Sequence, residues 1–467
     1  MVAFRKGEKM GNREFKNTFL ISAGIFLADC IVIYLSNVIS QFTTLHAINF
    51  YFLMVYAAVY GIIAFNLDMY SVNNKKRFDI LLSITIAAVI ASAAALFFDY
   101  FLFNPHAYLF RLQYLSFYLV VYLLMLVWRL TLQHLIKKSR AHAKLLVIEE
   151  KNIDNALARK IKYSCLDWFD SWYTQVDSND PDAIEEFIRG EFSQYDNIFI
   201  TQTIPEQARK RLVAEAIRTN KEIYMLPSLY DINITKYDMV QFDDTPSFRI
   251  RPFRLTPGQR VTKRGFDFVC SLLGMVIASP LFLLVSIAIK LDSKGPVFYT
   301  QERVTRDGRR FHIYKFRTMR ADAEKLSGPV LASDDDPRIT RVGKALRLTR
   351  LDELPQLINI LTGDMSIVGP RPERPFFVEK FCEEIEDYDK RHAVKAGLTG
   401  YAQVYARYDT DATDKLLYDL LYIREYSLAL DLRIILLTIK TMFDKEASGG
   451  VKEKPDWSKP KTEALPK

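Results

Sequence analysis

The stretch LRLTRLDELPQLINILTGDMSIVGPRPERP, residues 346–375, decides the fold of the part of the chain that carries chemistry. Leucine and isoleucine recur in it at helical spacing. Pro355 fits a first helical turn, because its missing N–H would have no partner there. Asp352 and Glu353 are therefore predicted to cap a helix N-terminus, where the helix dipole stabilises carboxylates and attracts phosphate.

A short strand and a stiff turn are predicted after this helix. Gly363 and Asp364 end the helix, and residues 366–368 form the strand. The sequence Gly-Pro-Arg-Pro at 369–372 then fixes Arg371 in one place, and a fixed guanidinium can bind phosphate through paired hydrogen bonds. The acid pair alone also fits a capped helix with solvated charges. The combination of acids, helix, turn and arginine favours a phosphate site.

Several long motifs extend this pattern across the second half of the chain. They are KRGFD (263–267), KFRTM (315–319), LDELPQL (351–357), GDMSIVGPRPERP (363–375) and GLTGYAQV (397–404). Together they resemble the bacterial polyprenyl-phosphate sugar-1-phosphate transferases, also called monotopic phosphoglycosyl transferases, over about residues 263–443. The front end of the chain resembles the large members, which start capsule, O-antigen or exopolysaccharide repeats.

Composition limits the classes of function. The 467 residues are sufficient for two or three domains, and the 49% of hydrophobic residues must be segregated from the 25% that are charged. A net charge of +8 suits nucleic acid, anionic lipid or phosphorylated substrates. No nucleic-acid motif occurs, so the sequence predicts no nucleic-acid partner. The four scattered cysteines indicate neither disulfides nor a metal site, which suits a reduced, cytoplasm-facing protein.

Residues 1–140 are predicted to form a four-helix transmembrane anchor. Each apolar segment has the ~20 residues needed to cross a bilayer. Lysines and arginines precede the first segment, separate the second from the third and follow the fourth, which places both ends in the cytoplasm. Asp29, Asp68 and Asp99 lie in or near the segments, where interfacial placement or helix pairing is favoured over a polar path. The segments are Thr18–Ile39, Ala47–Leu67, Ile80–Phe103 and Tyr108–Leu130.

Residues 141–245 alternate between strand and helix patterns, including a helix over 152–163, and predict a small parallel αβ sheet. A dinucleotide site would need a Gly-rich turn after the first strand, but Glu149 and Glu150 stand there. We therefore expect a Rossmann-like domain without an evident cofactor site. Residues 246–262 are predicted to be a linker, and residues 446–467 a disordered tail.

Residues 263–445 are predicted to form a mixed α+β catalytic domain with a fifth apolar run. Basic residues flank both ends of this run, which disfavours moving either end across the membrane. Pro280 removes a helical hydrogen bond, and the hydroxyl of Ser279 can satisfy the freed backbone group. The sequence thus predicts a re-entrant helix over 264–291 with a helix–break–helix at Ser279 and Pro280. An ordinary fifth span is the alternative.

Two further groups of basic residues point to phosphate. Two strands around an Asp307-Gly308 turn lead to Lys315 and Arg317, which with Arg371 are predicted to bind the substrate's phosphates. A basic helix face, suited to inner-leaflet anionic lipids, is predicted from Arg338, Arg341, Lys344, Arg347 and Arg350. Downstream, residues 376–392 are predicted to be an amphipathic helix and residues 397–403 a glycine-containing loop.

The resemblance implies a covalent mechanism on the cytoplasmic side of the bacterial inner membrane. Asp352 would attack the β-phosphorus of a UDP-hexose, glucose or galactose, and release UMP. The resulting phosphosugar ester would pass to undecaprenyl phosphate. Glu353 would orient a metal or balance charge, and Mg²⁺ would be held at Asp352.

The remaining expectations concern binding and assembly. Lys263 and Arg264, with Asp267 available to pair with one of them, are placed to hold the lipid phosphate. Gly400, Tyr401 and Gln403 are expected to contact the nucleotide or sugar, although Ala396 and Tyr401 depart from the proline and tryptophan common in the family. A homodimer is expected. The competing functions are a membrane-bound nucleotide-sugar diphosphatase and a non-catalytic polysaccharide assembly scaffold.

Overall fold

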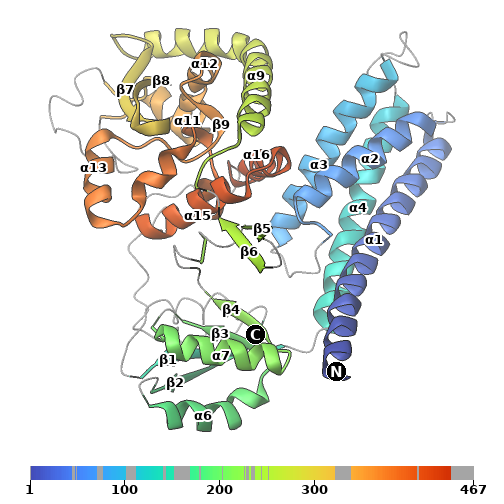
Figure 1. The fold of residues 1–467 in the computed structure, drawn as a ribbon. Helices are drawn as coiled ribbons and strands as arrows, with labels where there is room; N and C mark the ends of the chain where they lie inside the picture. The colour runs from blue at the N-terminus through green and yellow to red at the C-terminus, as the bar shows by residue number, and fades with distance from the viewer. Residues whose placement is uncertain are drawn as a thin grey trace, which may run out of the picture. The chain divides into compact units, whose positions relative to one another are not determined.

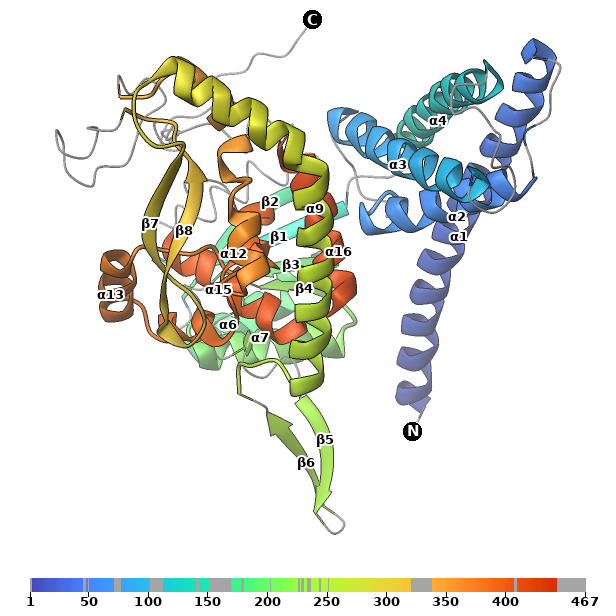
Figure 2. The same cartoon turned by 90° about the horizontal axis from the view of Figure 1, so that it is seen from above.

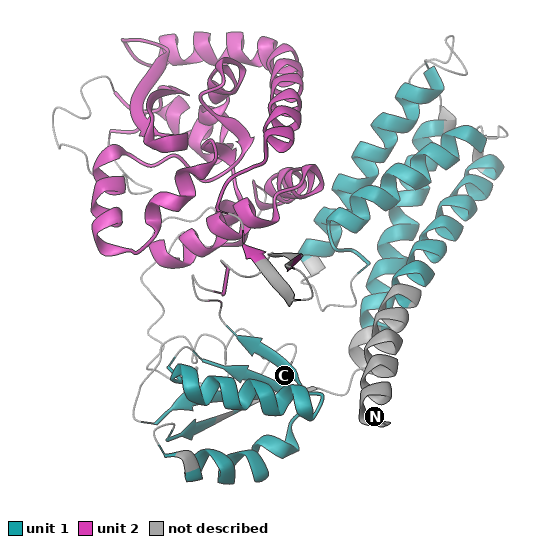
Figure 3. Cartoon of the chain, viewed as in Figure 1, with its two compact units in different colours: residues 1–226, 455–467 teal, residues 227–454 magenta. Residues whose placement is uncertain are grey.

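The chain divides into two compact units, residues 1–226 with 455–467 and residues 227–454 (Figure 3). The structure is a computed structural model. It describes residues 2–44, 48, 50–70, 77–100, 112–139, 143–151, 169–177, 180–201, 203–225, 227, 231–232, 237–242, 245–250, 252–320, 338–406 and 410–442.

All four apolar segments of the front end are helical (Figure 1). They are α1 (Val2–Thr44), α2 (Phe50–Asn66), α3 (Arg77–Phe98) and α4 (Leu112–Ser139). By length and composition, α1, α3 and α4 could cross a membrane, and so could α9 (Pro257–Asp292) of the second unit. Helix α2 has 17 residues, about 25 Å at ~1.5 Å per residue, and is shorter than the other predicted spans.

Two of the three aspartates of the bundle, Asp29 and Asp99, connect its helices through hydrogen bonds, and the sequence favoured helix pairing as one role for them. Asp29 on α1 accepts hydrogen bonds from Arg129 Nη2 at 2.5 Å and from Trp128 Nε1 at 2.9 Å, both on α4. Asp99 accepts a hydrogen bond from the Tyr114 hydroxyl at 2.6 Å. A buried charge pair of this kind is costly to break, because removing one partner leaves the other uncompensated.

The predicted parallel sheet is present. Its strands are β1 (Ala143–Glu150), β2 (Phe169–Val176), β3 (Asn197–Ile200) and β4 (Glu222–Met225), in the order β2-β1-β3-β4 with every pairing parallel. Helices α6 (Pro181–Arg189) and α7 (Glu206–Arg218) pack on it through a core that includes Ile148, Ile198 and Leu212. The helix predicted over 152–163 lies outside the described residues. The Rossmann-like character of this domain and its lack of a cofactor stay predictions.

The second unit is a mixed α+β assembly around two small sheets. Strands β7 and β8 form an antiparallel hairpin, and β9 and β10 pair in parallel. A separate antiparallel hairpin, β5–β6, precedes α9. The elements are β5 (Tyr237–Phe242), β6 (Thr245–Ile250), α9, β7 (Phe298–Val304), η3 (Arg306–Gly308), β8 (Arg310–Phe316), α11 (Arg341–Leu348), η4 (Leu351–Glu353), α12 (Gln356–Thr362), β9 (Ser366–Val368), α13 (Pro375–Glu384), η5 (Tyr388–Ala393), β10 (Gly397–Thr399), α14 (Tyr401–Tyr405), α15 (Ala412–Glu425) and α16 (Leu428–Met442).

Local assignments differ from the sequence prediction in three places. The predicted linker 246–262 contains β6 and the first residues of α9. The helix predicted over 376–392 ends at Glu384 and is followed by η5, and the loop predicted over 397–403 is formed by β10 and α14. Of these elements, β6 pairs with the neighbouring strand β5, whereas β10 pairs with the more distant β9. Short strands of this kind are specified only weakly by their own sequence. The tail 446–467 lies outside the described residues.

Helix α9 is bent but continuous, where the sequence predicted a helix–break–helix (Figures 1 and 2). Pro280 lies inside it and cannot donate to the carbonyl of Val276. The hydroxyl of Ser279 donates to that carbonyl at 2.8 Å and takes over the missing bond, as expected from the sequence. The helix therefore tolerates the proline without ending.

Both ends of α9 are fastened to the same unit. Near its start, Lys263 Nζ donates to Asp431 Oδ2 at 2.7 Å. At its end, Arg317 Nη2 donates to the carbonyl of Ser293 at 2.8 Å. Between these anchors the outer face is apolar and exposed, including Val276, Ile277, Leu283, Leu284, Ile287 and Leu291. An apolar face of this extent marks an interaction surface, and the re-entrant placement of the helix in a membrane stays a prediction.

Topology can be tested with cysteines at the two exposed flanks of α9. In a background without the four native cysteines, Arg260→Cys and Lys294→Cys should react with a membrane-impermeant maleimide from the same side of sealed vesicles. Both should react fully after permeabilisation. Labelling of the two sites from opposite sides would show that α9 is an ordinary span.

Candidate active site

A left-handed residue sets the position of the acid pair. Arg350 has φ of 56°, a conformation that costs a non-glycine residue about 1–2 kcal/mol, and it follows the end of α11 rather than continuing its basic face. The chain then makes the single turn η4, which contains Asp352 and Glu353. The prediction that these acids cap the next helix is wrong. Pro355 occupies the N-cap position of α12, with no side-chain cap hydrogen bond.

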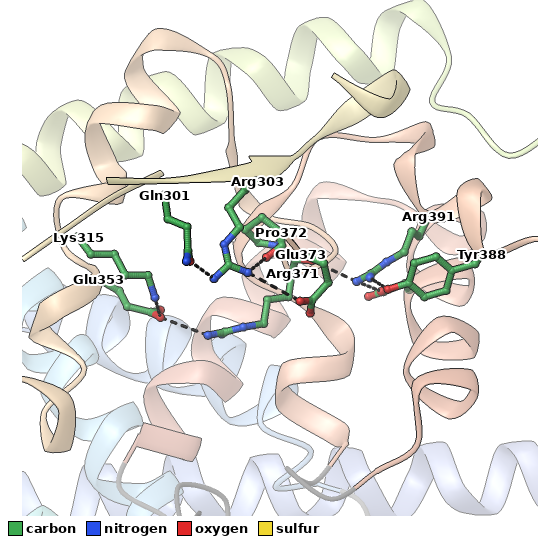
Figure 4. A network of polar contacts seen from close by, with 10 residues as sticks. Gln301, Arg303, Lys315, Glu353, Arg371, Pro372, Glu373, Tyr388 and Arg391 are labelled. Carbon is green, nitrogen blue, oxygen red and sulfur yellow. Dashed lines mark hydrogen bonds and ion pairs between the residues drawn. The ribbon is translucent and has the colours of Figure 1, made fainter. Parts of the chain in front are cut away.

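Glu353 instead binds two cations that are distant from it in sequence. Its Oε1 accepts a hydrogen bond from Lys315 Nζ of β8 at 2.7 Å. The same oxygen accepts from Arg371 Nη2, in the turn after β9, at 3.3 Å. Figure 4 shows Glu353 between these two side chains. The structure thus brings together Glu353, Lys315 and Arg371, three of the predicted site residues.

The two acids have opposite electrostatics. Burial by itself would raise the pKa of Glu353, but Lys315 and Arg371 outweigh burial and hold it at about 2. Burial and the neighbouring Glu353 charge raise the pKa of Asp352, against the weaker pull of nearby cations. Among the described residues, no hydrogen bond or ion pair reaches the Asp352 carboxylate. One acid is therefore ionised and held, and the other is a free carboxylate in a partly desolvated place.

A small cavity opens beside this cluster. It is lined by Lys315, Glu353 and Arg371 together with Arg303, Ile313, Gln356, Pro372, Gly397 and Leu398. Its polar lining is cationic on two sides, which suits a phosphate or diphosphate.

Two polar residues of β7 were missed by the sequence analysis. Arg303 Nη2 donates to Gln301 Oε1 at 2.7 Å, and Arg303 Nη1 donates to the carbonyl of Pro372 at 3.0 Å. Burial lowers the pKa of Arg303, and the neighbouring Arg371 charge adds to this effect. A signal was available: Gln301 and Arg303 alternate on the less exposed face of the strand, where apolar residues are usual.

Arg317 does not join the cluster, contrary to the prediction. It lies just past the end of β8, is 5% exposed, and donates to the Ser293 hydroxyl and to the carbonyls of Ser293 and Lys294. A buried guanidinium satisfies its donors with the nearest carbonyls, here those at the end of α9. Arg317 therefore anchors that helix end.

The two basic residues at the start of α9 also have protein partners. Lys263 is buried, with its Nζ 2.7 Å from Asp431 and 3.9 Å from Asp267, so Asp267 pairs loosely with one of its two expected partners. Arg264 donates to the carbonyls of Ile360 and Leu361, in the last turn of α12, where a cation is favoured by the helix dipole. These contacts give Lys263 and Arg264 structural roles. Their binding of a lipid phosphate stays a prediction.

Of the three residues predicted to contact the nucleotide or sugar, Gly400 packs against the turn that carries Arg371. A Cβ on Gly400 would lie 2.2 Å from the carbonyl oxygen of Gly369, so two backbones meet here without room for a side chain. The Tyr401 ring packs against that of Tyr405, with centroids 4.8 Å apart. Gln403 Nε2 donates to the carbonyl of Leu398 at 3.4 Å. The cavity lining includes Gly397 and Leu398 of the same motif in place of the three predicted residues.

The acid pair offers one carboxylate, that of Asp352, to the magnesium ion that the sequence led us to expect. Mg²⁺ is commonly held by one or two carboxylates together with substrate phosphates and water. Asp352 supplies a carboxylate that no described side chain engages. Within the described part of the chain, histidine, cysteine, aspartate and glutamate do not form a group of three or more that could hold a metal.

Comparison with known proteins gives one family and several relatives. Residues 258–445 match the family described as "Bacterial sugar transferase". An Aeromonas hydrophila UDP-N-acetylgalactosamine-undecaprenyl-phosphate N-acetylgalactosaminephosphotransferase is 41% identical over 223 residues, covering 45% of this chain and 52% of the relative. An Escherichia coli K12 UDP-glucose:undecaprenyl-phosphate glucose-1-phosphate transferase is 37% identical over 258 residues, covering 54% and 55%.

A shorter relative is covered almost completely. The exopolysaccharide production protein PSS of Rhizobium leguminosarum bv. phaseoli is 41% identical over 187 residues, which are 38% of this chain and 94% of that protein. Of the two longer relatives, this chain spans about half the length.

The Glu353 pair makes a prediction about stability and pH. Because the folded pKa of about 2 lies below the ordinary 4.5, the pair stabilises the fold above pH 4.5 and loses this effect as the pH falls through 2. Glu353→Gln should lower the free energy of unfolding by about 1–3 kcal/mol at pH 7, and the difference from wild type should shrink between pH 4.5 and 2. Denaturant unfolding of the detergent-solubilised protein measures both.

The matched control is Glu302→Gln on β7. Glu302 makes an exposed pair with Arg310 at 3.6 Å, so its loss should change the unfolding free energy by less than about 1 kcal/mol. A Glu353→Gln effect no larger than this control, or one that grows at low pH, would contradict the assignment.

Proposed function

This chain belongs to the bacterial sugar transferase family, and from that membership we propose that it transfers hexose-1-phosphate from a UDP-sugar to undecaprenyl phosphate and releases UMP. The observation that carries the proposal is the division of the acid pair. Glu353 holds Lys315 and Arg371 beside the cavity, and the Asp352 carboxylate has no partner among the residues that the structure describes. The relatives described above are named for N-acetylgalactosamine and glucose, and for this chain we expect glucose or galactose.

Asp352 would act as the nucleophile. Its carboxylate oxygen forms a bond to the β-phosphorus, and the bond from that phosphorus to the bridging oxygen breaks, so UMP leaves with the electron pair. An oxygen of undecaprenyl phosphate then attacks the same phosphorus and frees the Asp352 carboxylate. Two steps replace one direct encounter of two anions. Burial favours this role, because a raised pKa makes the ionised oxygen a stronger base.

Lys315 and Arg371 would stabilise the phosphate charge. An ammonium has three N–H donors and a guanidinium five, so each can keep its bond to Glu353 and still offer donors to a phosphate. Glu353 thus holds the two cations in place before substrate binds. Donors fixed in advance stabilise a transition state at little reorganisation cost.

Magnesium would be held by Asp352 together with oxygens of the substrate diphosphate, and it would neutralise phosphate charge there. We also place the site at the inner leaflet of the bacterial inner membrane, facing the cytoplasm, with α9 as a re-entrant helix. The bend, the shared anchoring of both ends and the exposed apolar face support this placement. We also propose that the protein forms a homodimer.

The reaction is tested by UMP release. Purified protein with Mg²⁺ is given UDP-glucose, UDP-galactose or UDP-N-acetylgalactosamine, with and without undecaprenyl phosphate. We expect one sugar to give equal amounts of UMP and lipid-linked sugar phosphate. We also expect sustained UMP release only when undecaprenyl phosphate is present. Sustained release of UMP and free sugar phosphate without lipid would identify a diphosphatase, and no release with any of the three sugars would favour a scaffold.

The covalent step is tested at Asp352. Asp352→Asn keeps the size of the side chain but removes the nucleophilic charge, so UMP release should fall by about 10³-fold or more. In the wild type, omission of the lipid should allow a hexose-phosphate adduct on Asp352 to be found by mass spectrometry. Asp364→Asn, which changes a carboxylate bonded to Arg309 beyond the far end of α12, is the control and should stay within a few-fold of wild type. Near wild-type release by Asp352→Asn would exclude the covalent route.

A further inference from the structure

The turn that carries Arg371 is held from outside. Pro370 and Pro372 have no N–H, so the turn has few donors of its own. Its four consecutive carbonyls each accept a hydrogen bond from another element: Pro370 from Gly397 N–H at 2.9 Å, Arg371 from Arg391 Nη2 at 3.2 Å, Pro372 from Arg303 Nη1 at 3.0 Å and Glu373 from Val304 N–H at 3.0 Å. Two of the four donors are main-chain amides and two are arginine side chains.

Arg391 is the donor whose own position is most strongly determined. It lies in η5, is 6% exposed, and has its Nη2 2.7 Å from Asp419 Oδ2 on α15. Its Nη1 donates to the Tyr388 hydroxyl (Figure 4). Asp419 is 1% exposed, so water could not solvate either charge of this pair if its partner were removed. One planar guanidinium thus connects α15, Tyr388 and the carbonyl of Arg371.

Arg391 is behind the turn, not in the cavity. The cavity beside Glu353 is lined by Arg371 and Arg303 but not by Arg391, which lines a neighbouring pocket together with Pro370, His392 and Arg371 itself. A ligand in the first cavity would meet Arg371 directly. Any effect of Arg391 on that ligand must pass through the main chain of Arg371.

We propose that Arg391, oriented by Asp419, is a positioning residue that fixes the main chain of Arg371 and thereby the direction of its guanidinium toward Glu353 and the substrate phosphate. This assignment rests on the proposed function, since it names what holds the phosphate-binding arginine. Only arginine offers a rigid planar fork that reaches three acceptors at once. The effect on rate follows from geometry, because a displacement of about 1 Å at a reacting group can cost ~10²-fold.

The first test is a double-mutant cycle on UMP release. Arg391→Lys keeps the charge but cannot span the three acceptors, and it should lower kcat by about 10- to 100-fold with a smaller change in KM. In an Arg371→Met background the same change should cost less than about 3-fold, because the guanidinium that it positions is gone. Equal factors in both backgrounds would show a general structural role and overturn the proposal.

The second test does not require activity. Amide hydrogen exchange at Gly369 and Arg371 should be faster in Arg391→Lys than in wild type, with α7 as an unaffected internal reference. Should Arg391→Lys fail to fold, Asp419→Asn and Tyr388→Phe each loosen one support of Arg391 and should show the same increase. Unchanged exchange in all three variants would overturn the proposal. If the wild type released no UMP, the proposed function would fail while this test still decided whether Arg391 holds the turn.

The matched control is Lys390→Met. Lys390 is the neighbour of Arg391 on η5, but its side chain is exposed and makes only loose ion pairs, at 4.0 Å with Asp387 and 3.6 Å with Asp389. This variant should leave both kcat and the exchange of the turn unchanged. An equal effect of Lys390→Met would show that any change in η5 disturbs the turn and would count against a specific role of Arg391.

Discussion

The ionised carboxylate of Glu353 is the interaction on which the candidate site depends. It holds Lys315 from β8 and Arg371 from the turn after β9, and without it the two cations would face the same cavity without the carboxylate that pairs with both. The pKa of about 2 shows that the cations outweigh the burial of the acid. Glu353 binds both cations, and its neighbour Asp352 has no hydrogen bond or ion pair to its carboxylate within the described part of the chain. Two adjacent acids thus acquire different roles from their surroundings.

The same cluster explains why the turn after β9 must be rigid. A guanidinium placed against a buried carboxylate is useful to a ligand only if its backbone does not move. The turn obtains this rigidity from the two prolines, from the backbone packing of Gly369 against Gly400, and from four donors on three other elements, β7, η5 and β10. Two arginine side chains and two main-chain amides of the second unit therefore support one side chain at the cavity.

Helix α9 turns polar side chains toward the protein and apolar ones outward, the reverse of a surface helix in a soluble protein. Its first half turns Lys263, Asp267 and Ser271 toward the protein and Val269, Leu272 and Leu273 outward. Polar groups buried at spacings of four residues are satisfied by Asp431 and by the amide of Ile367. Such a helix is stable when lipid covers its outer face, because the polar groups are then the ones that need protein partners.

The sequence by itself determined what depends on neighbours along the chain. Spacing predicts the apolar segments, and turn chemistry predicts the strands on either side of Asp307-Gly308. The hydrogen bond from Ser279 beside Pro280 and the contact between Lys263 and Asp267 follow from the reach of side chains within one helix. The tertiary structure alone decided which cations share the cavity. Lys315 and Arg317 are two residues apart, yet one binds Glu353 and the other the end of α9, and Arg391 with Asp419 gave no local signal. A buried charge takes the partner that folding brings nearest, and that partner comes from another part of the chain.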